Sequence, residues 1–270
     1  MMPKFFIISD VHGFYDEMIK ALDKAGFDEN NPDHWLIGCG DYHDRGRQPL
    51  KTMMYLEKLP RKVLVRGNHE QLMEDMCERG FPYSHDVSNG TFATAWQLDP
   101  TAPIDPYAID YDMVLKRLKP FFNQMVNYFE TKNYIFVHSW VPLINKDGLP
   151  AHYTKNRKFE FNPDWRNASQ EDWDEAMWGN PFKQWQEGLN KTGKTIVFGH
   201  WHCSTGHSML TEIKISEFES ECKISEFEDD AIWEPFIYDN IIGIDRCTAH
   251  TGEVNVLVLE DEFLDSKSNN

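Results

Sequence analysis

The amino-acid sequence predicts an α/β fold, in which buried strands alternate with helices. Short runs of β-branched and aromatic residues recur along the chain, and such runs are typical of strands that are covered on both faces. Segments with an apolar stripe at helical spacing lie between several of these runs. With 270 residues the chain can bury roughly three quarters of its unfolded surface, so it can form a substantial core without disulfides.

Five apolar runs are predicted to be strands, and polar residues follow each of them within a few positions. The runs lie at 5–8, 35–37, 63–65, 134–137 and 195–198. The residues that follow include Asp, His and Asn. Because ligands of open α/β sheets bind beyond the carboxyl ends of the strands, these polar residues are the candidate functional residues of the chain.

The remaining segments are predicted to be mostly helical. The expected helices cover 14–25, 48–58, 70–79, 111–129 and 170–187. Three prolines within 99–107 predict a loop there. Near the C-terminus, 241–244 and 254–259 have the composition of strands and flank a Thr-Gly turn, so we expect them to pair antiparallel in a second sheet.

We expect a single domain over residues 1–262, followed by a polar tail at 263–270. This domain contains a helical insertion at about 81–130 and an acidic insertion at about 211–232. Within the acidic insertion, the residues Lys-Ile-Ser-Glu-Phe-Glu occur twice, nine residues apart. Two copies are too few for a solenoid, so we expect this segment to be a surface loop or an edge hairpin.

The composition limits the classes of partner. With 27 basic and 44 acidic residues the net charge is −17, which excludes a general nucleic-acid backbone binder and disfavours an anionic membrane surface. A phosphate substrate would therefore need a local cation, and a metal centre could supply it. No apolar stretch suits a signal peptide or a membrane span, and the five cysteines form no Cys-x-x-Cys pair, so we expect a cytoplasmic protein.

Residues 188–195 match the pattern of the phosphate-binding P-loop, G-x-x-x-x-G-K-[ST]. A P-loop follows a strand and begins a helix, because the N-terminus of that helix binds the phosphates. Here a predicted helix precedes the match and a predicted strand follows it. Since this order is reversed, we interpret 188–195 as a helix-to-strand turn and not as a nucleotide site.

The residues at the strand ends form a set of potential metal ligands. Asp10 and His12 are two positions apart, so on an extended backbone they point to the same side and can share a metal ion. The other potential ligands are Asp41, Asn68, His138 and His200. Oxygen and imidazole ligands without thiolates suit Mn, Fe or Zn, and six of them exceed the needs of one ion, which predicts a two-metal site bridged by a carboxylate. One histidine at a strand end is as often a buried core residue, but five such strand ends favour a metal site.

Five motifs in this order resemble those of the calcineurin-like metallophosphoesterases. They are Ser-Asp10-Val-His12-Gly, Gly-Asp41-Tyr-His-Asp44-Arg45-Gly, Gly-Asn68-His69-Glu70, Val-His138 and Gly-His200. Residues 243–248 are similar to the closing motif of bacterial members. Within the family the sequence most resembles the phosphoprotein phosphatase branch, with the bacterial and bacteriophage Ser/Thr phosphatases and diadenosine tetraphosphate hydrolases. The resemblance implies a two-sheet β-sandwich flanked by helices.

The resemblance also implies a role for each matching residue. Two divalent cations, Mn or Fe or alternatively Zn, would be held by Asp10, His12, Asp41, Asn68, His138, His200 and His202, with Asp41 as the bridge. Arg45 would bind phosphoryl oxygens, because a guanidinium can pair with two of them. His69 would be the general acid, and Asp44 would orient and charge its imidazole. Asp245 would lie next to the metal ligands.

Several positions depart from the pattern of the phosphoprotein phosphatase branch. His43 replaces an aliphatic residue and is either packed or a spare imidazole, whereas Ser139-Trp140 replaces two glycines, which would narrow the site. His202 follows the broader superfamily and not this branch. Asn180 stands where many bacterial relatives have an arginine, so a second phosphate-binding arginine is unassigned. The candidates for it are Arg157 and Arg166.

The residues and the resemblance together predict an enzyme that hydrolyses phosphomonoesters, with phosphoserine or phosphothreonine in a protein, or a small phosphoester, as substrate. A hydroxide activated by two metal ions would attack phosphorus in line, and a general acid would protonate the leaving oxygen. The alternatives are a symmetrical dinucleoside tetraphosphate hydrolase and, less favoured, a phosphodiesterase. A non-catalytic scaffold is disfavoured, because it should have lost ligands such as Asp41, Asn68 or His200 that are costly to bury unpaired.

Overall fold

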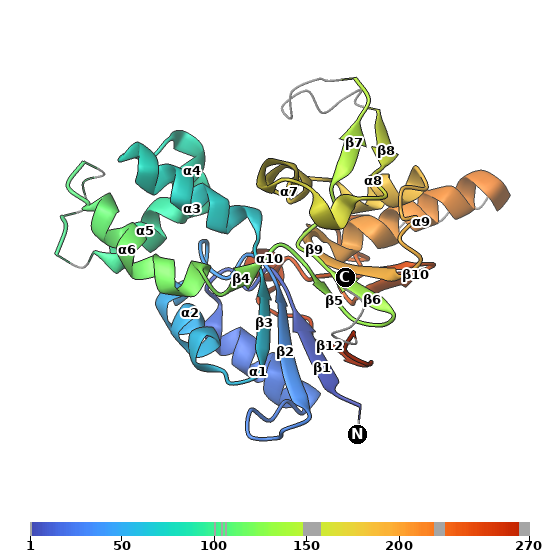
Figure 1. The fold of residues 1–270 in the computed structure, drawn as a ribbon, viewed down its shortest axis with the longest axis horizontal. Coiled ribbons are helices and arrows are strands. Elements are labelled where there is room, and N and C mark those ends of the chain that lie inside the picture. The colour runs from blue at the N-terminus through green and yellow to red at the C-terminus, as the bar shows by residue number, and fades with distance from the viewer. Residues whose placement is uncertain are drawn as a thin grey trace.

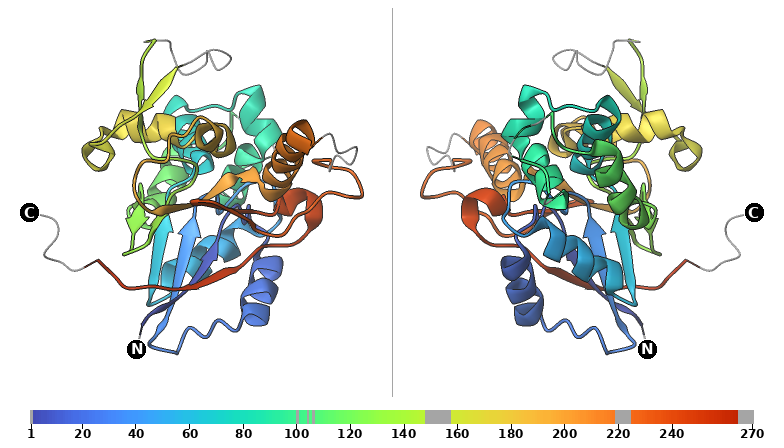
Figure 2. Two further views of the ribbon diagram at one scale, coloured as in Figure 1. Left: turned by 90° about the vertical axis from the view of Figure 1, so that its right-hand side faces the viewer. Right: turned by 90° about the vertical axis from the view of Figure 1, so that its left-hand side faces the viewer.

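The computed structural model describes residues 2–99, 101–103, 105, 107–147, 158–218 and 225–264. Two five-stranded sheets lie face to face, and helices cover their outer faces (Figure 1, Figure 2). The predicted α/β fold, a two-sheet β-sandwich flanked by helices, is confirmed. The candidate Arg157 and the tail residues 265–270 lie outside the described residues.

The first sheet has the strand order β12-β1-β2-β3-β4. Four of its strands are parallel, namely β1 (Lys4–Ile8), β2 (His34–Cys39), β3 (Lys62–Val65) and β4 (Met125–Val126). The fifth strand, β12 (Leu257–Glu260), pairs antiparallel with β1 at the edge. Three of the predicted strands become β1, β2 and β3, so three adjacent carboxyl ends meet at one edge of this sheet.

The second sheet has the strand order β10-β11-β9-β6-β5. Its strands are β5 (Phe129–Glu130), β6 (Tyr134–Phe136), β9 (Thr195–His202), β10 (Phe236–Tyr238) and β11 (Ile241–Asp245). Strand β9 is parallel to β6 and to β11, so the two predicted strands β6 and β9 end at the same edge. A separate hairpin pairs β7 (Leu143–Asn145) with β8 (Phe159–Phe161).

The helices fall into two groups along the chain. The first group is α1 (Tyr15–Ala25), α2 (Pro49–Lys58), α3 (Asn68–Arg79), α4 (Ser84–Asn89), α5 (Thr91–Leu98) and α6 (Tyr111–Phe122). The second group is the 3-10 helix Trp165–Asn167, α7 (Gln170–Ala176), α8 (Pro181–Gln186), α9 (Cys203–Phe218) and α10 (Thr248–Thr251). Helices α1, α2 and α3 lie where the sequence predicts them. No helix within the described ranges combines the length and the apolar composition needed to cross a bilayer.

The apolar runs are buried on both faces because each central strand lies between two layers. Phe5 and Ile7 of β1 pack with Phe136 of β6 in the core between the two sheets. Phe6 and Ile8 point to the opposite face and pack in the core beneath the first group of helices. The same period of two along one strand therefore fills two cores, which is why the run carries no polar residue.

Two predicted helices are shorter than expected. The helix expected at 111–129 ends at Phe122, because the residues after it form β4 and β5. The helix expected at 170–187 is two helices, α7 and α8. Pro181 is the first residue of α8 and has no backbone N–H to continue α7, while the Asn180 side chain caps the new helix.

The predicted pairing of the two C-terminal strands is wrong. Strand β11 belongs to the second sheet, whereas β12 pairs with β1 in the first. The short helix α10 and residues 252–256 carry the chain from one sheet to the other. Strand β12 pairs with the open edge of β1 and satisfies the backbone hydrogen bonds of that edge. A local hairpin between β11 and β12 would leave this edge of β1 uncovered.

The edge hairpin considered for 211–232 does not form in the described part of this segment. Residues 211–218 complete α9, and 225–232 contain no strand, while 219–224 lie outside the described residues. At the C-terminus, Phe263 forms an isolated bridge with Thr131 and its ring packs against Phe5. The packed chain therefore extends at least to Phe263.

Candidate metal centre

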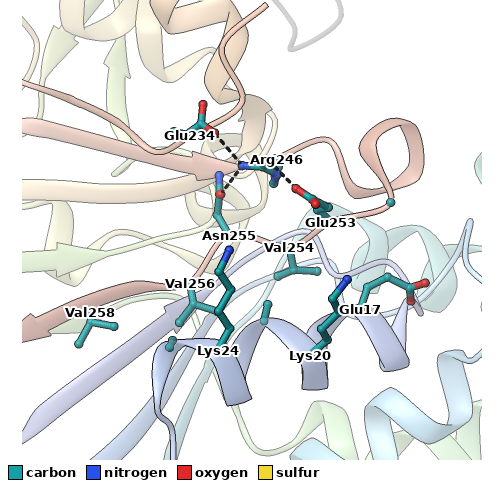
Figure 3. A pocket seen from close by; sticks show the side chains of 13 residues that line it. Glu17, Lys20, Lys24, Glu234, Arg246, Glu253, Val254, Asn255, Val256 and Val258 are labelled. Atoms are coloured by element: carbon teal, nitrogen blue, oxygen red, sulfur yellow. Dashed lines mark hydrogen bonds and ion pairs between the residues drawn. The ribbon is translucent and has the colours of Figure 1, made fainter.

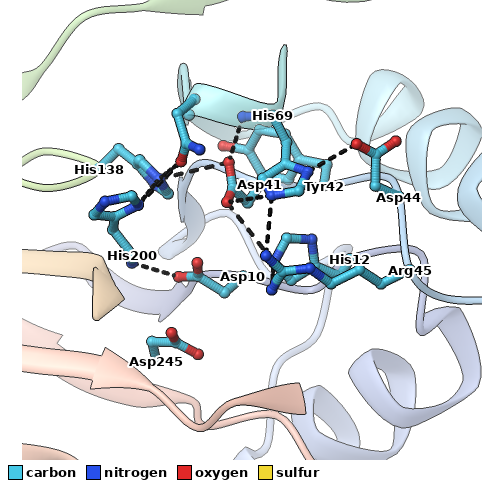
Figure 4. Close-up of polar contacts among 12 residues, drawn as sticks. Asp10, His12, Asp41, Tyr42, Asp44, Arg45, His69, His138, His200 and Asp245 are labelled. Atoms are coloured by element: carbon cyan, nitrogen blue, oxygen red, sulfur yellow. Dashed lines mark hydrogen bonds and ion pairs between the residues drawn. The ribbon is translucent and has the colours of Figure 1, made fainter. Parts of the chain in front are cut away.

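The carboxyl ends of β1, β2, β3, β6 and β9 converge, and the side chains that follow them meet there (Figure 4). The backbone turns sharply at these ends, and eight non-glycine residues of the described chain have a positive φ. Six of the eight belong to this cluster, namely Asp10, His12, Asp41, Asp44, Arg45 and His200. Left-handed backbone is costly for such residues, so its concentration here favours a functional site.

Asp41 lies at the centre of the cluster and is buried. Its Oδ2 is 3.7 Å from Nε2 of His12 and 3.9 Å from Nε2 of His69. Its Oδ1 is 3.5 Å from Nε2 of His138. Burial acts to raise the pKa of Asp41, but the charges of His138 and the other histidines lower it well below its ordinary value. The carboxylate is therefore ionised, and its two oxygens face two different groups of potential ligands.

Asn68, His138 and His200 form the group on one side of Asp41. Asn68 Oδ1 is 2.7 Å from His138 Nε2 and 3.0 Å from His200 Nδ1, and these two nitrogens are 3.2 Å apart. His138 Nδ1 lies 2.7 Å from the carbonyl oxygen of Cys39, so Nδ1 carries the proton and Nε2 is left as an acceptor. An amide oxygen and two imidazole nitrogens that converge in this way fit a divalent cation.

The two histidines of this group differ in their affinity for protons. Burial acts to lower the pKa of His138, but the charge of Asp41 outweighs it and raises that pKa. Burial and the neighbouring His138 lower the pKa of His200 to about 3. The imidazole of His200 is therefore neutral near pH 7, and one of its ring nitrogens has a lone pair available for metal binding.

Asp10 and His12 follow β1 and complete the cluster. Asp10 Oδ2 accepts a hydrogen bond of 2.9 Å from the backbone N–H of His200, and burial raises the pKa of Asp10 to about 6. His12 Nδ1 lies 3.1 Å from the carbonyl oxygen of His43, which leaves Nε2 directed at Asp41. Burial lowers the pKa of His12, so its imidazole is neutral and can act as a ligand.

Asp44 and His69 form a buried pair beside this cluster. His69 Nδ1 is 2.7 Å from Asp44 Oδ2, and His69 Nε2 is 3.1 Å from the Arg45 guanidinium. Asp44 Oδ2 also accepts a hydrogen bond of 2.6 Å from the Thr91 hydroxyl. Burial acts to raise the pKa of Asp44, but the charge of His43 lowers it well below its ordinary value. Asp44 is therefore an anion that fixes the orientation of the His69 ring.

His43 is a packed residue and not a spare ligand of the cluster. Its side chain is completely buried, with Nδ1 2.7 Å from Asp44 Oδ1 and Nε2 3.6 Å from Glu70 Oε1. Burial acts to lower the pKa of His43, but the charge of Asp44 raises it to about 9. A protonated imidazole between two carboxylates explains why a histidine occupies this buried position.

Glu70 is a site residue to which the sequence analysis gave no role. Its carboxylate accepts hydrogen bonds from the backbone N–H groups of Asp41 (3.0 Å), Tyr42 (3.0 Å) and Gly67 (2.8 Å). It therefore holds together the loops that present Asp41 and begin α3. A Cβ on Gly67 would collide with the Asp41 carboxylate, so glycine is required there. Glu70 is the third residue of α3 after Gly67, and this capping-box position could have indicated its role.

His202 does not join either group of potential ligands. Its Nε2 is 3.9 Å from Oδ2 of Asp245 and its Nδ1 is 3.8 Å from Oε1 of Glu226. Asp245 is buried next to the cluster, and burial together with the charge of Asp10 raises its pKa to about 7. Asp245 thus lies where the resemblance implies, whereas His202 turns toward two carboxylates.

Other expected features of the site are not formed. Trp140 is buried in the core of the second sheet and Ser139 donates a hydrogen bond to the Gly179 carbonyl, so neither narrows the site. Asn180 serves as the cap of α8.

The segment that resembles a P-loop is a helix-to-strand turn, as predicted, and joins α8 to β9. Lys194 Nζ lies 2.8 Å from Oε1 of Glu130. Glu130 also accepts a hydrogen bond of 2.8 Å from Nε of Arg166. Both cations are therefore engaged by one carboxylate, and Arg166 is not placed to serve as the second phosphate-binding arginine.

A cavity of about 490 Å³ lies elsewhere, between α1 and the chain that follows β11 (Figure 3). Lys20 and Lys24 line it from α1, and Arg246 lines the opposite wall. Arg246 pairs with Glu234 and Glu253, and the lining contains three basic and three acidic residues. The charges balance, so this cavity has no electrostatic preference for phosphate.

The family model of the calcineurin-like phosphoesterases matches residues 3–204, a range that includes every strand end of the cluster. The chain belongs to this family. It is a hydrolase of the metallophosphoesterase type, and its histidines and carboxylates are clustered as metal binding requires.

Individual relatives differ in the substrates that their names state. The chain is 27% identical to the asymmetrical bis(5'-nucleosyl)-tetraphosphatase PrpE of Bacillus velezensis over 216 residues, which cover 72% of this chain and 76% of that protein. It is 38% identical to the serine/threonine-protein phosphatase PP1-delta of Caenorhabditis elegans over 73 residues, or 25% of this chain and 23% of that protein. It is 42% identical to the symmetrical bis(5'-nucleosyl)-tetraphosphatase of Aeromonas salmonicida over 64 residues, or 23% of each chain.

A solved structure of a cold-active protein tyrosine phosphatase has a similar fold. The TM-score is 0.51 with 16% sequence identity, and the match covers 96% of this chain and 74% of that chain. At this identity the similarity concerns the fold and carries no information on substrate.

Proposed function

We propose that the chain hydrolyses phosphoesters at the cluster around Asp41 with two divalent cations. The observation that carries this proposal is the position of Asp41, whose two oxygens face different histidines. Carboxylate, amide and imidazole ligands without thiolate suit Mn or Fe, with Zn as the alternative. When bound, the cations would supply Lewis acidity toward phosphoryl oxygens and activate the water nucleophile.

The resemblance assigns the ligands of the two cations, and the geometry differs from it at one position. The group on one side of Asp41 contains His12 and His69, whereas Asp10 contacts the backbone of His200. One cation would be held by Asp10, His12 and Asp41, and the other by Asp41, Asn68, His138 and His200. Backbone carbonyls fix His12 and His138 in the tautomer that leaves the inward nitrogen free of a proton. His202 is not included in this set, because it contacts Asp245 and Glu226 instead.

Arg45 would bind the transferred phosphoryl group. Its guanidinium reaches into the cluster, 2.9 Å from Nε2 of His12 and 3.1 Å from Nε2 of His69 (Figure 4). The residue is exposed, so the guanidinium can turn from these nitrogens toward phosphoryl oxygens that enter from solvent. A planar guanidinium pairs with two such oxygens and offsets the charge that develops on them.

His69 would act as the general acid. Its Nδ1–H donates to Asp44, so the proton that it delivers to the leaving oxygen is the one on Nε2. Asp44 stabilises the protonated ring and prevents it from rotating. The position of His69 directly after Asn68, at the first turn of α3, places the ring beside the ligands.

Two substrate classes are candidates. The similarity to PP1-delta supports phosphoserine or phosphothreonine in a protein as the substrate. Among the described residues Arg45 is the one arginine that contacts the cluster, and one arginine suits a substrate with a single phosphoryl group. A dinucleoside tetraphosphate is supported by the much longer match to a bis(5'-nucleosyl)-tetraphosphatase, which covers 72% of this chain.

The proposal is tested by assays of the purified protein with and without Mn²⁺. The substrates are a phosphoserine peptide, diadenosine tetraphosphate and bis-p-nitrophenyl phosphate. We expect metal-dependent hydrolysis of the peptide or the dinucleotide, its loss in Asp41→Asn, and wild-type rates in Asp23→Asn, an exposed carboxylate of α1. Hydrolysis of the diester alone would replace the proposal with a phosphodiesterase, and equal rates in Asp41→Asn and wild type would reject it.

A further inference from the structure

Two partly exposed aromatic side chains lie near the proposed metal centre, one beside His200 and the other beside His202. Trp178, between α7 and α8, is 49% exposed, and its ring lies 6.3 Å from that of His200. Phe227, in the described end of the acidic insertion, is 53% exposed, and its ring lies 5.5 Å from that of His202. One exposed ring on a surface is ordinary, but two beside one charged cluster suggest a ligand that covers them.

Trp178 is held in a fixed orientation. Its Nε1–H donates a hydrogen bond of 2.9 Å to Oε1 of Gln71. Gln71 lies in α3, the helix that begins with Asn68 and His69. The indole is thus tied to the element that carries two residues of the proposed site, and it cannot turn away without breaking this bond.

Phe227 belongs to an aromatic cluster next to the site. Its ring lies 6.0 Å from that of Trp233 and 6.0 Å from that of His250, and the latter two rings are 5.4 Å apart. The rings of Phe227 and Trp233 also contact His202. This packing supports the Phe227 ring on one side, while half of its surface faces solvent.

The segment that carries Phe227 is anchored beside the metal ligands. Glu226 accepts a hydrogen bond of 2.7 Å from the Thr205 hydroxyl at the start of α9. His202 lies between Glu226 and the buried Asp245, which neighbours the cluster. His202 and Asp245 therefore lie between the aromatic cluster and the proposed metal centre.

We propose that Trp178 and Phe227 stack on the nucleobases of a nucleotide whose phosphate chain lies on the metal cluster. This inference rests on the proposed function. Base stacking on aromatic side chains needs no positive charge, which suits a chain with a net charge of −17. It selects the dinucleoside polyphosphate from the two candidate substrates, because a phosphoserine peptide brings no ring.

The distance of Phe227 from the cluster distinguishes a nucleobase from a phosphotyrosine ring. The ring of phosphotyrosine is bonded through one oxygen to the reacting phosphorus. His202 lies between Phe227 and the residues near the metal ligands, so such a ring would remain short of Phe227. A nucleobase is separated from the phosphorus by a ribose and further phosphates, and can reach past His202.

The kinetic test compares two substrates in single variants. We expect Trp178→Ala and Phe227→Ala to raise KM for diadenosine tetraphosphate by roughly 5- to 100-fold and to leave KM for a phosphoserine peptide without aromatic residues essentially unchanged. Trp178→Phe keeps a ring on which a base can stack but loses the bond to Gln71, so its KM should rise less than that of Trp178→Ala. Tyr238→Ala removes a 40% exposed ring on the edge strand β10 and serves as the matched control.

Three outcomes would overturn the inference. Equal losses on both substrates would mean that the rings support the structure of the site. An unchanged KM for the dinucleotide would mean that they do not touch the base. A rise in KM confined to a phosphotyrosine peptide would assign the rings to that substrate instead.

Binding of adenosine separates this inference from the proposed function, because adenosine has no phosphate to hydrolyse. Saturation-transfer NMR on the metal-free protein should show contacts to the adenine protons in wild type and in Tyr238→Ala, and weaker contacts in Phe227→Ala and Trp178→Ala. If no phosphoester is hydrolysed but adenosine binds in this pattern, the proposed function fails and the stacking sites stand. If the adenine contacts are equal in all variants, the stacking sites are rejected.

Discussion

The histidines on the two sides of Asp41 are the same residue type in opposite surroundings. His69 donates its Nδ1–H to the Asp44 carboxylate, whereas His138 donates its Nδ1–H to the Cys39 carbonyl. A carboxylate partner carries a negative charge, whereas a carbonyl partner is neutral and only selects which ring nitrogen carries the proton. We propose that this difference suits His69 to proton transfer and His138 to metal binding.

Replacement of Asp41 removes the carboxylate that both His69 and His138 face, so it should have the largest effect. In Asp41→Asn we expect metal content to fall toward zero and hydrolysis to fall by roughly 10³-fold or more, since two bound cations contribute several kcal/mol to catalysis. Elemental analysis and steady-state assays of the same preparation measure both quantities. Two tightly held metal ions per chain in this variant would contradict the bridging role.

Replacement of His69 should remove only the proposed proton transfer and leave the proposed metal ligands in place. A seryl alkoxide must be protonated as it leaves, whereas p-nitrophenolate is stable without a proton. We expect His69→Asn to slow hydrolysis of a phosphoserine peptide by about 10²–10⁴-fold and that of p-nitrophenyl phosphate much less, with metal content unchanged. Asp44→Asn should show the same bias more weakly. If both substrates slow equally with the metals retained, His69 has another role and the acid lies elsewhere.

Replacement of Glu70 tests whether one carboxylate positions both the loop that carries Asp41 and the start of α3, which carries His69. Glu70→Gln removes the charge that holds the N–H groups of Asp41, Tyr42 and Gly67, so the Asp41 loop and the start of α3 should both loosen. We expect metal affinity to fall by roughly 10–100-fold, with rates restored at high Mn²⁺. Titration of activity with Mn²⁺ provides the measurement. An unchanged metal affinity would show that Glu70 matters only for stability.

Lys194→Ala should have the smallest effect on activity, within a few-fold, because the P-loop-like turn lies outside the site. It should cost stability instead, by about 1 kcal/mol at pH 7, through the ion pair with Glu130. Burial acts to raise the pKa of Glu130, but Arg166 and Lys194 lower it below its ordinary 4.5. The contribution is therefore complete above pH 4.5 and is lost as the pH falls below it.

Urea unfolding of wild type and Lys194→Ala at pH 7 and pH 4 measures this difference. The gap between the two proteins should shrink at the lower pH. ATP binding that disappears with Lys194 would instead restore the P-loop interpretation of 188–195.

The proposed ligands could be identified in the sequence because each lies at the end of a buried strand or within a few residues of it. Continuous apolar runs identify such strands, and parallel strands bring their carboxyl ends to one edge of a sheet. This explains why Asp10, His12, Asp41 and Asn68 share one edge of the first sheet and why His138 and His200 share one edge of the second. The packing of the two sheets then brings the two edges together. The turns after the strands also explain the positive φ values, which only the folded backbone reveals.

Local patterns identified the longer strands and several of the helices, since each depends on a few neighbouring side chains. The short strands β4, β5, β7, β8 and β10 were not identified in this way. Tertiary structure decided which elements come together. Strand β12 joined the first sheet because β1 offered an open edge, and His202 turned to Asp245 and Glu226 because β11 and the acidic insertion pack beside it. Glu70 acquired its role through backbone N–H groups 28 and 29 residues away. Contacts over such separations depend on the path of the whole chain, and no short segment of sequence encodes that path.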